Sequence, residues 1–275
     1  MTNSKNLEKS TSTSRGIVVF AFNTETVDYV KIADRTSQLA SCYMDLPITL
    51  ITDHDADPIF RYDNIITIDP QGGTFKTDDH TKRWRNFGRH HAYALSPYDE
   101  TVLLDTDYLV LDNSLNTLFE TDFDYKLMHH NTNYGGAVYE QMGETSLPFV
   151  WATVVLFRKS KKTELLFDLV GKIQRNYQYY RALYNIREGN YRNDYAFAIA
   201  NNILSGYSLN ESQGIPWKMF TIEEKIDQVL YDDNFLYVYS EGTGKVVARQ
   251  NIHIMDKQYL QSTDFVQLIN GLTNL

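Results

Sequence analysis

The segment Thr101-Val102-Leu103-Leu104-Asp105-Thr106-Asp107-Tyr108-Leu109-Val110-Leu111 holds two carboxylates between two apolar runs. Alternation along a strand puts Asp105 and Asp107 on the same side, with Thr106 opposite. Carboxylates rarely lie between buried segments unless they are paired, hydrogen-bonded or bound to a metal. We therefore predict that this pair binds a divalent cation, and that the cation binds a nucleoside diphosphate. The alternative is structural: Asp105 caps a turn while Asp107 pairs with a nearby arginine.

The chain before this segment alternates apolar runs with amphipathic stretches. Strands are predicted over 16–22, 47–53 and 64–69, and helices over about 26–43, capped by Asn23 or Thr24, and about 81–96. This order predicts an α/β fold with a mostly parallel central sheet flanked by helices. Ligands of such sheets bind at the carboxyl ends of the strands, and the aspartate pair lies there or in the turn just beyond.

The chain after this segment continues with both kinds of element. We expect, in order, a short helix over 114–119, a strand over 125–130, a long loop over 131–147, a strand over 148–158, and helices over about 160–185 and 193–204. Short strands follow near 217–220, 228–231, 236–240 and 246–248, before a closing helix over about 257–271. Polar residues 1–15 predict a disordered tail. Because no linker rich in Pro, Gly or Ser interrupts the rest, residues 16–275 are predicted to form a single domain with a small strand-rich C-terminal part.

Composition limits the classes of protein that fit. With 275 residues, 43% of them apolar, the chain can bury a large core, which excludes a disordered protein. The net charge of −9 argues against coating of nucleic acid or of an anionic membrane, although a local basic patch is compatible with it. The single cysteine, Cys42, excludes an internal disulfide and a cysteine-based zinc cluster. Since no apolar run suits a membrane span or a signal peptide, we expect a cytoplasmic protein.

A cluster of basic residues precedes the aspartate pair. Residues 81–91 contain four Lys and Arg residues, two His and no acid. On the predicted helix, Lys82, Arg85 and Arg89 share one face, which suits contact with a nucleotide phosphate or an anionic acceptor. The alternative for each residue is a solvated helix face. In an acidic chain, such clustering favours a role in binding.

Two later positions carry further candidates. His253 is an imidazole, a common metal ligand, and it lies four residues before Lys257, a point charge suited to phosphate. Either residue alone has an ordinary structural interpretation. They become candidates for a binding site only in combination with the aspartate pair. Asn193 and Asp194 begin a predicted helix, where amides and acids also occur as capping residues.

Together these residues resemble the GT-A class of nucleotide-sugar glycosyltransferases, most closely the glycogenin and galactinol-synthase type of family 8. The resemblance covers the order of elements over residues 16–260 and implies a GT-A, Rossmann-like fold. It also implies metal-dependent transfer of a sugar from a nucleoside-diphosphate sugar to an acceptor hydroxyl. Mn²⁺ or Mg²⁺ would be the cation, bound by Asp105, Asp107 and His253, and Lys257 would contact the diphosphate.

The resemblance implies roles for other residues as well. The first strand and its loop would hold the base and ribose, through Phe20, Phe22, Asn23 and Thr24. A basic residue before the metal motif would contact the donor, and the candidates are Arg83, Arg85 and Arg89. Asn193 and Asp194 would contact the transferred sugar or the acceptor. In an inverting enzyme Asp194 would be the base, and in a retaining enzyme either residue would support the sugar.

The acceptor and two other functions stay open. The acceptor can be a small saccharide, a protein side chain or a modified base, as in hydroxymethylated DNA of phage type, in which case the enzyme would work in the host cytoplasm. A sugar nucleotidyltransferase would share the sheet, but it would show a Gly-rich, basic loop where this chain has Phe20-Ala21-Phe22-Asn23-Thr24. A phosphatase would carry its Asp-x-Asp motif after its first strand, whereas in this chain three predicted strands come before the motif. A non-catalytic nucleotide-sugar-binding module with a decayed site is the remaining alternative.

Overall fold

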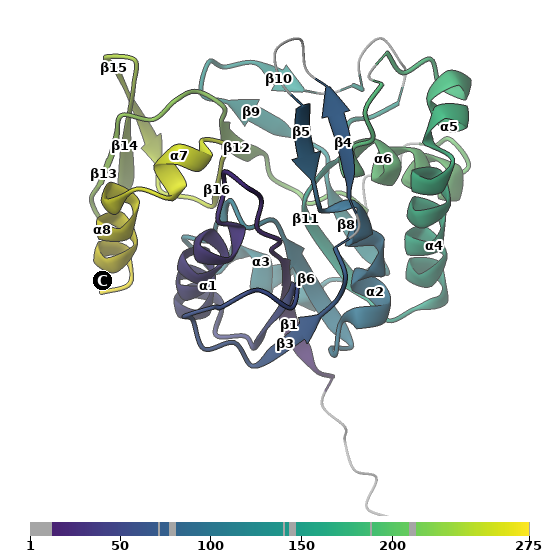
Figure 1. The fold of residues 1–275 in the computed structure, drawn as a ribbon, viewed down its shortest axis with the longest axis horizontal. Coiled ribbons are helices and arrows are strands. Elements are labelled where there is room, and N and C mark those ends of the chain that lie inside the picture. The colour runs from purple at the N-terminus through teal and green to yellow at the C-terminus, as the bar shows by residue number, and fades with distance from the viewer. Residues whose placement is uncertain are drawn as a thin grey trace, which may run out of the picture.

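A six-stranded sheet forms the centre of the computed structural model, which describes residues 13–70, 72–76, 81–139, 141–142, 147–187, 189–208 and 213–274 (Figure 1). Its strands in spatial order are β3 (Asn64–Thr67), β2 (Ile48–Thr52), β1 (Arg15–Phe20), β6 (Glu100–Leu104), β11 (Trp151–Arg158) and β8 (Tyr125–Met128). The first four are parallel, whereas β11 runs antiparallel to both of its neighbours. The predicted α/β fold with a mostly parallel central sheet is therefore confirmed.

Helices cover this sheet on two sides. Helix α1 (Tyr29–Met44) connects β1 to β2, and α4 (Lys161–Arg175), α5 (Tyr177–Leu183) and α6 (Asn193–Leu204) follow β11. In Figure 1, α1 lies to the left of the sheet and α4, α5 and α6 lie to the right. Because both faces are covered, β2 and β6 are buried along their whole length, which explains their continuous apolar runs.

Two further sheets complete the arrangement. The second contains, in order, β10 (Val138–Tyr139), β9 (Asn131–Asn133), β12 (Met219–Ile222), β16 (Ile252–Ile254) and β7 (Tyr108–Leu109). The third is antiparallel and contains β13 (Gln228–Tyr231), β14 (Phe235–Ser240) and β15 (Thr243–Ala248). Together with α7 (Lys257–Leu260) and α8 (Thr263–Leu272), these strands surround a second apolar core. The strand-rich C-terminal part is thus present.

The predicted basic helix over 81–96 is wrong. Residues 81–84 form strand β5 (Thr81–Trp84), which pairs with β4 (Gly73–Lys76). A 3-10 helix, η1 (Phe87–His91), and a single helical turn, α2 (Ala92–Leu95), follow. The pairing with β4 overrides the local helical pattern, and Gly88 is a weak helix former at its centre.

Other predicted boundaries differ less. The predicted helix over 160–185 is two helices, because Asn176 between α4 and α5 leaves the helical conformation. The loop over 131–147 contains β9 and β10, and the closing helix divides where Ser262 caps α8. The segment over 114–119 forms α3 (Ser114–Thr117) and η2 (Leu118–Glu120). The predicted tail lies mostly outside the described residues, and Arg15 already belongs to β1. Within the described part, no helix is long and apolar enough to cross a membrane.

A close approach fixes the start of β1. A Cβ added to Gly16 would lie 2.3 Å from a ring carbon of Tyr98. The Tyr98 ring is itself buried, and its hydroxyl lies 2.9 Å from Thr49 Oγ1 on β2. The ring cannot move away without breaking that hydrogen bond, so the strand requires glycine here for space.

Gly16→Ala should therefore destabilise the protein. We expect a loss of about 1–3 kcal/mol in the free energy of unfolding, as for overpacking of a core. Urea unfolding followed by circular dichroism measures the loss. Gly189→Ala is the matched control, because an added Cβ there meets no atom within 4 Å. Equal losses in the two variants would contradict the steric explanation.

Candidate active site

A cavity of about 500 Å³ opens at the carboxyl ends of β1 and β6. Its walls come from six parts of the chain that are far apart in sequence, as expected for a site at the edge of a parallel sheet. The lining residues are Phe20, Phe22, Thr24, Tyr29, Arg85, Asn86, Arg89, Asp105, Thr106, Asp107, Trp151, Ala152, Thr153, Asn190, Tyr191, Arg192, Asn193, Asp194, His253, Met255 and Lys257.

The aspartate pair lies in the turn just beyond β6, which is one of the two positions predicted for it, and it does not belong to one continuous strand. Strand β6 ends at Leu104, and the turn is closed by a hydrogen bond of 3.2 Å from Tyr108 N to Asp105 O. The chain then enters β7, which belongs to the second sheet and pairs with β16. Because the chain changes sheets between the two carboxylates, Asp105 and Asp107 have different partners.

Asp107 binds two residues from the end of the chain. Lys257 Nζ donates a hydrogen bond to Asp107 Oδ2, and His253 Nε2 lies 3.3 Å from the same oxygen. Burial alone would raise the pKa of the Asp107 carboxyl, but Lys257 and His253 outweigh it and hold that pKa well below its usual value. Burial also disfavours the charged form of Lys257, yet Asp107 overcomes this and raises the pKa of Lys257. Asp107 and Lys257 therefore form a charged pair at neutral pH.

Asp105 binds a buried arginine instead. Arg89 Nη1 donates to Asp105 Oδ1 at 2.6 Å, and Arg89 Nη2 donates to Ala152 O, also at 2.6 Å. The Arg89 side chain is 1% exposed, whereas that of Asp105 is 29% exposed and lines the cavity. Burial raises the pKa of the Asp105 carboxyl, and the Arg89 guanidinium opposes this shift. Helix η1 thus places a fixed cation beneath the turn.

The imidazole of His253 is oriented by the second sheet. His253 on β16 is in register with Thr221 on β12, and His253 Nδ1 lies 3.4 Å from Thr221 Oγ1. Thr221 Oγ1 in turn donates to Asn131 Oδ1 on β9 at 2.8 Å. The Trp151 ring packs at 72° to the imidazole, with the ring centres 6.0 Å apart. These contacts direct Nε2 toward Asp107, as second partners of an imidazole commonly do.

Asn193 and Asp194 lie at the start of α6 and line the same cavity. Asp194 Oδ1 accepts a hydrogen bond from Ala152 N at 2.9 Å, and Asp194 Oδ2 accepts from Arg192 Nε at 3.1 Å. The Asn193 side chain donates to Asn86 O at 3.0 Å and accepts from the Tyr191 hydroxyl at 2.9 Å. Ala152 therefore links Asp194 to Arg89 through its backbone N–H and C=O.

The residues predicted to hold the nucleoside divide into two groups. Phe20, Phe22 and Thr24 line the cavity, next to Tyr29, which the sequence does not single out. Asn23 does not line it. The Asn23 side chain instead accepts a hydrogen bond of 3.0 Å from Val30 N, and so holds the first turn of α1.

The basic residues do not share a helix face, contrary to prediction. Arg85 follows β5 and lines the cavity, with its guanidinium 3.6 Å from Asp53. Arg89 is buried beneath the aspartate turn. Arg83 belongs to β5 and pairs in register with Thr74, and its side chain lies outside the described part of the structure.

The predicted metal ligands come together only in part. Within the described residues, no group of three or more His, Cys, Asp and Glu side chains is arranged to hold a metal ion. The reason is visible in the contacts, since Arg89 holds Asp105 and Lys257 takes the Asp107 oxygen that lies nearest His253. A carboxylate and an imidazole nevertheless lie together at the cavity, and this donor set suits Mn²⁺ in its chemistry.

Several supporting residues have no signal in the sequence. Ala152, Thr221 and Asn131 occupy ordinary strand positions, and Trp151 reads as a core residue. Their importance depends on the partners that the folded chain brings to them. Arg192 is the exception, because it belongs to the stretch Arg192-Asn193-Asp194 at the start of the predicted helix.

Comparison with known proteins shows the fold. No protein-family profile and no curated protein matches the chain. The solved structure of the galactosyltransferase LgtC, in complex with donor and acceptor sugar analogs, matches at 15% identity with a TM-score of 0.51, over 94% of this chain and 97% of that one. The chain therefore has a GT-A glycosyltransferase fold.

Two other solved structures match less closely. The glycosyltransferase GlyE of Streptococcus pneumoniae TIGR4 matches at 14% identity with a TM-score of 0.39, over 70% of this chain and 43% of that one. Mouse xyloside xylosyltransferase 1 matches at 11% identity with a TM-score of 0.45, over 72% of this chain and 84% of that one. The chain thus spans less than half of the length of GlyE. Membership of family 8 stays a prediction.

Removal of the buried guanidinium should be costly. We expect Arg89→Met to lower the free energy of unfolding by about 3 kcal/mol, because Asp105 and Ala152 O lose their partner. Arg89→Lys should recover only part of this loss, since an ammonium cannot reproduce the two-pronged contact. The measurement is urea unfolding. Arg85→Met, which removes a longer and more exposed pair, should change stability by less than about 1 kcal/mol. Similar losses for Arg85 and Arg89 would contradict the assignment.

His90, beside Arg89 on η1, gives the protein a pH dependence. Burial, reinforced by His91 and Arg175, lowers the pKa of His90 to about 4. In the unfolded chain its pKa is about 6.5, so between these values the unfolded state binds the extra proton and stability falls as the pH falls. After allowance for partial exposure, we expect this residue to account for about 1–2 kcal/mol of the loss between pH 7 and pH 4.

His90→Gln should remove that part of the acid sensitivity. Unfolding by urea at the two pH values measures it, as the difference between the losses of the wild type and the variant. The exposed His54 provides the control, because His54→Gln should leave the loss unchanged. A His90→Gln protein with the wild-type loss would disprove the effect.

Proposed function

We propose that this chain is a metal-dependent glycosyltransferase that moves a sugar from a nucleoside-diphosphate sugar to an acceptor hydroxyl. The observation that carries the proposal is the convergence of Asp107, His253 and Lys257 on one cavity at the carboxyl ends of the sheet. Asp107 and Lys257 are separated by 150 residues in sequence. A purely structural ion pair would not need an imidazole, a second carboxylate and an open cavity at the same place.

The charges of the site support a role for a divalent cation. Asp105 and Asp107 are balanced by Arg89 and Lys257, so this part of the cavity is close to neutral. A bound diphosphate would add negative charge that these residues do not balance. Asp107 and His253, with Asp105, would hold Mn²⁺ or Mg²⁺, which when bound neutralises charge on the leaving nucleoside diphosphate. Lys257 would then move from Asp107 to the diphosphate, where its ammonium stabilises the same charge.

Asp194 would hold the transferred sugar. In the reaction, the bond between the anomeric carbon and the diphosphate oxygen breaks, and the diphosphate leaves with the electron pair. The anomeric carbon bonds to the acceptor oxygen, whose proton passes to the leaving diphosphate. Arg192 contacts Asp194 Oδ2 through two nitrogens, Nε at 3.1 Å and Nη2 at 2.8 Å. Asp194 Oδ1 accepts one hydrogen bond, from Ala152 N, and keeps a lone pair that can accept from a sugar hydroxyl. We therefore assign Asp194 to positioning the sugar, with Asn193 beside it.

The nucleoside would lie against Phe20, Phe22 and Thr24, because these residues line the end of the cavity formed by the first strand. Arg85 would contact the donor from the other side of the cavity. The acceptor is a small saccharide or a hydroxymethylated DNA base. LgtC, whose structure holds donor and acceptor sugar analogs, agrees with a saccharide, but at 15% identity the likeness extends to the fold alone.

Asp107→Asn tests the proposal. We expect release of nucleoside diphosphate from a panel of sugar donors to require Mn²⁺ in the wild type, to stop with a chelator, and to fall roughly 100-fold in the variant. Product nucleotide is measured by chromatography. Asp122→Asn, at an exposed carboxylate, is the control and should leave the rate unchanged. Unchanged turnover in Asp107→Asn would rule out the assignment. Binding of nucleoside diphosphates in native mass spectrometry, without turnover on any donor, would favour a non-catalytic binding module.

A further inference from the structure

A second cavity, of about 530 Å³, lies beside the first. It is formed by η1, the end of α4, the start of α5 and the segment before α6. Its side chains include the rings of Phe87, Tyr177 and Tyr179, the guanidinium of Arg175, and the amides of Gln174 and Gln178. None of these residues lines the first cavity, which is proposed above to bind the nucleotide-sugar donor and is called the donor cavity below. The second cavity, called the groove below, therefore needs a separate explanation.

The two cavities share one wall. Asn190 and Tyr191 line both of them. The Tyr191 ring packs edge-on against Phe87, with ring centres 5.1 Å apart, and against Tyr177, at 5.6 Å. Tyr191 is 8% exposed, and its hydroxyl donates to Asn193 at the sugar-holding end of the donor cavity. The groove therefore adjoins the end of the first cavity that Asn193 and Asp194 line.

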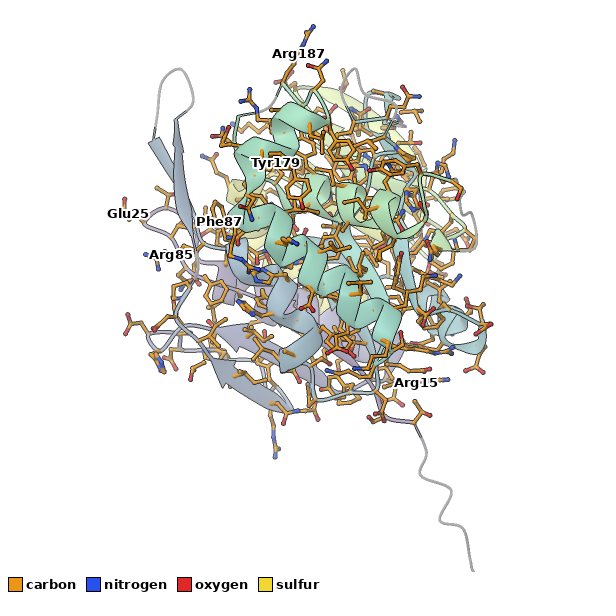
Figure 2. All side chains as sticks on the ribbon, turned by 90° about the vertical axis from the view of Figure 1, so that its right-hand side faces the viewer. Arg15, Glu25, Arg85, Phe87, Tyr179 and Arg187 are labelled. Atoms are coloured by element: carbon orange, nitrogen blue, oxygen red, sulfur yellow. The ribbon has the colours of Figure 1, made fainter. Side chains whose placement is uncertain are left out.

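The groove carries an open aromatic ring and an uncompensated cation. Tyr179 is 65% exposed, although it lies in a helix whose neighbouring ring, Tyr177, is buried. Arg175 is exposed, and none of the ion pairs found among the described residues involves it. Figure 2 shows Tyr179, Phe87 and Arg85 in succession across this face, with Arg187 above them. A ring and a guanidinium that line the same groove suit a ligand that is both flat and anionic.

Charge is distributed unevenly along the chain, and the groove lies in its basic part. Segments 81–93 and 169–193, which flank the groove, hold nine Lys and Arg residues and one acid, Glu188. This leaves 17 Lys and Arg residues and 34 Asp and Glu residues for the rest of the chain. Where basic residues gather in an acidic protein, anions are attracted to that region and repelled elsewhere. A neutral saccharide would need no such asymmetry.

We propose that this groove binds a nucleic-acid strand, and that the acceptor hydroxyl is carried by a base of that strand. The inference rests on the proposed function, because it names the acceptor of the same reaction. Stacking platforms joined to a positively charged groove are how proteins hold single strands without reading their sequence. Tyr179 stacks on a base, Arg175 contacts the backbone phosphate, and the neighbouring base passes over Tyr191 into the donor cavity. Duplex DNA would supply that base by turning it out of the stack.

Binding of a fluorescein-labelled single-stranded DNA of about 16 nucleotides, followed by fluorescence anisotropy, tests the proposal. Tyr179→Ala and Arg175→Ala should each raise the Kd about 10-fold. The two variants should differ in salt dependence. Arg175→Ala should reduce the slope of log Kd against log salt by about 0.7, while Tyr179→Ala should leave it unchanged. Both side chains are exposed, so both proteins should keep the wild-type circular dichroism spectrum and unfolding midpoint.

Matched controls lie far from the groove. Arg61→Ala removes an exposed arginine next to β3, and Tyr239→Ala removes a ring that is 37% exposed on β14. Neither should change the Kd by more than about twofold. Dextran sulfate, an anionic saccharide without bases, serves as the competing probe.

Three results would overturn the proposal. The first is that the groove variants bind DNA as tightly as the control variants do, and the second is that the wild-type protein does not bind the DNA. The third is tight binding of dextran sulfate that Tyr179→Ala does not weaken, which would indicate that the ligand of the groove is an anionic glycan. Failure of the proposed function is detected separately. Native mass spectrometry of the same preparations with Mn²⁺ and nucleoside diphosphates reports on the donor cavity, whatever the outcome with DNA.

Discussion

The contacts of Asp107 join the two halves of the molecule. Its backbone carbonyl accepts a hydrogen bond of 3.0 Å from Ile254 N, and its carboxylate binds Lys257 and approaches His253. The central sheet and the second sheet are therefore connected through this residue. A buried carboxylate is unfavourable by itself. Here it is tolerated because β16, which carries His253 and leads to Lys257, also pairs with β7 next to Asp107. The shape of the donor cavity depends on this junction.

The other carboxylate, that of Asp105, is bound by a buried arginine. Arg89 is fixed from below by η1 and spans Asp105 and the backbone of Ala152. The same alanine donates its N–H to Asp194. A single buried guanidinium thus connects the aspartate turn, strand β11 and the start of α6, so that the residues assigned to the metal and those assigned to the sugar form one rigid network.

Much of the fold could be predicted because its signals are local. Apolar runs and turn residues locate β1, β2, β6 and β11, and the parallel direction of most strands follows from the alternation with helices. Residues 81–96 could not be assigned this way. Strand β5 forms because it pairs with β4, and the local sequence pattern, which is helical, gives no sign of this pairing. Likewise, Asp105 and Asp107 could be selected from their buried flanks. The identity of their partners could not, because Arg89 reaches Asp105 only after the predicted helix is replaced by η1.

The pairing of β7 with β16 also has a consequence for the order of folding. Strands β1, β2, β3 and β6 are all made within the first 104 residues, and they can pair through short connections. His253 and Lys257 arrive only near the end of synthesis, and closing a loop of 150 residues costs more entropy than closing the connections within the sheet. The donor cavity is therefore among the last features to be assembled. A nascent chain shorter than about 250 residues would contain the strands of the central sheet but would lack His253 and Lys257, which line the cavity.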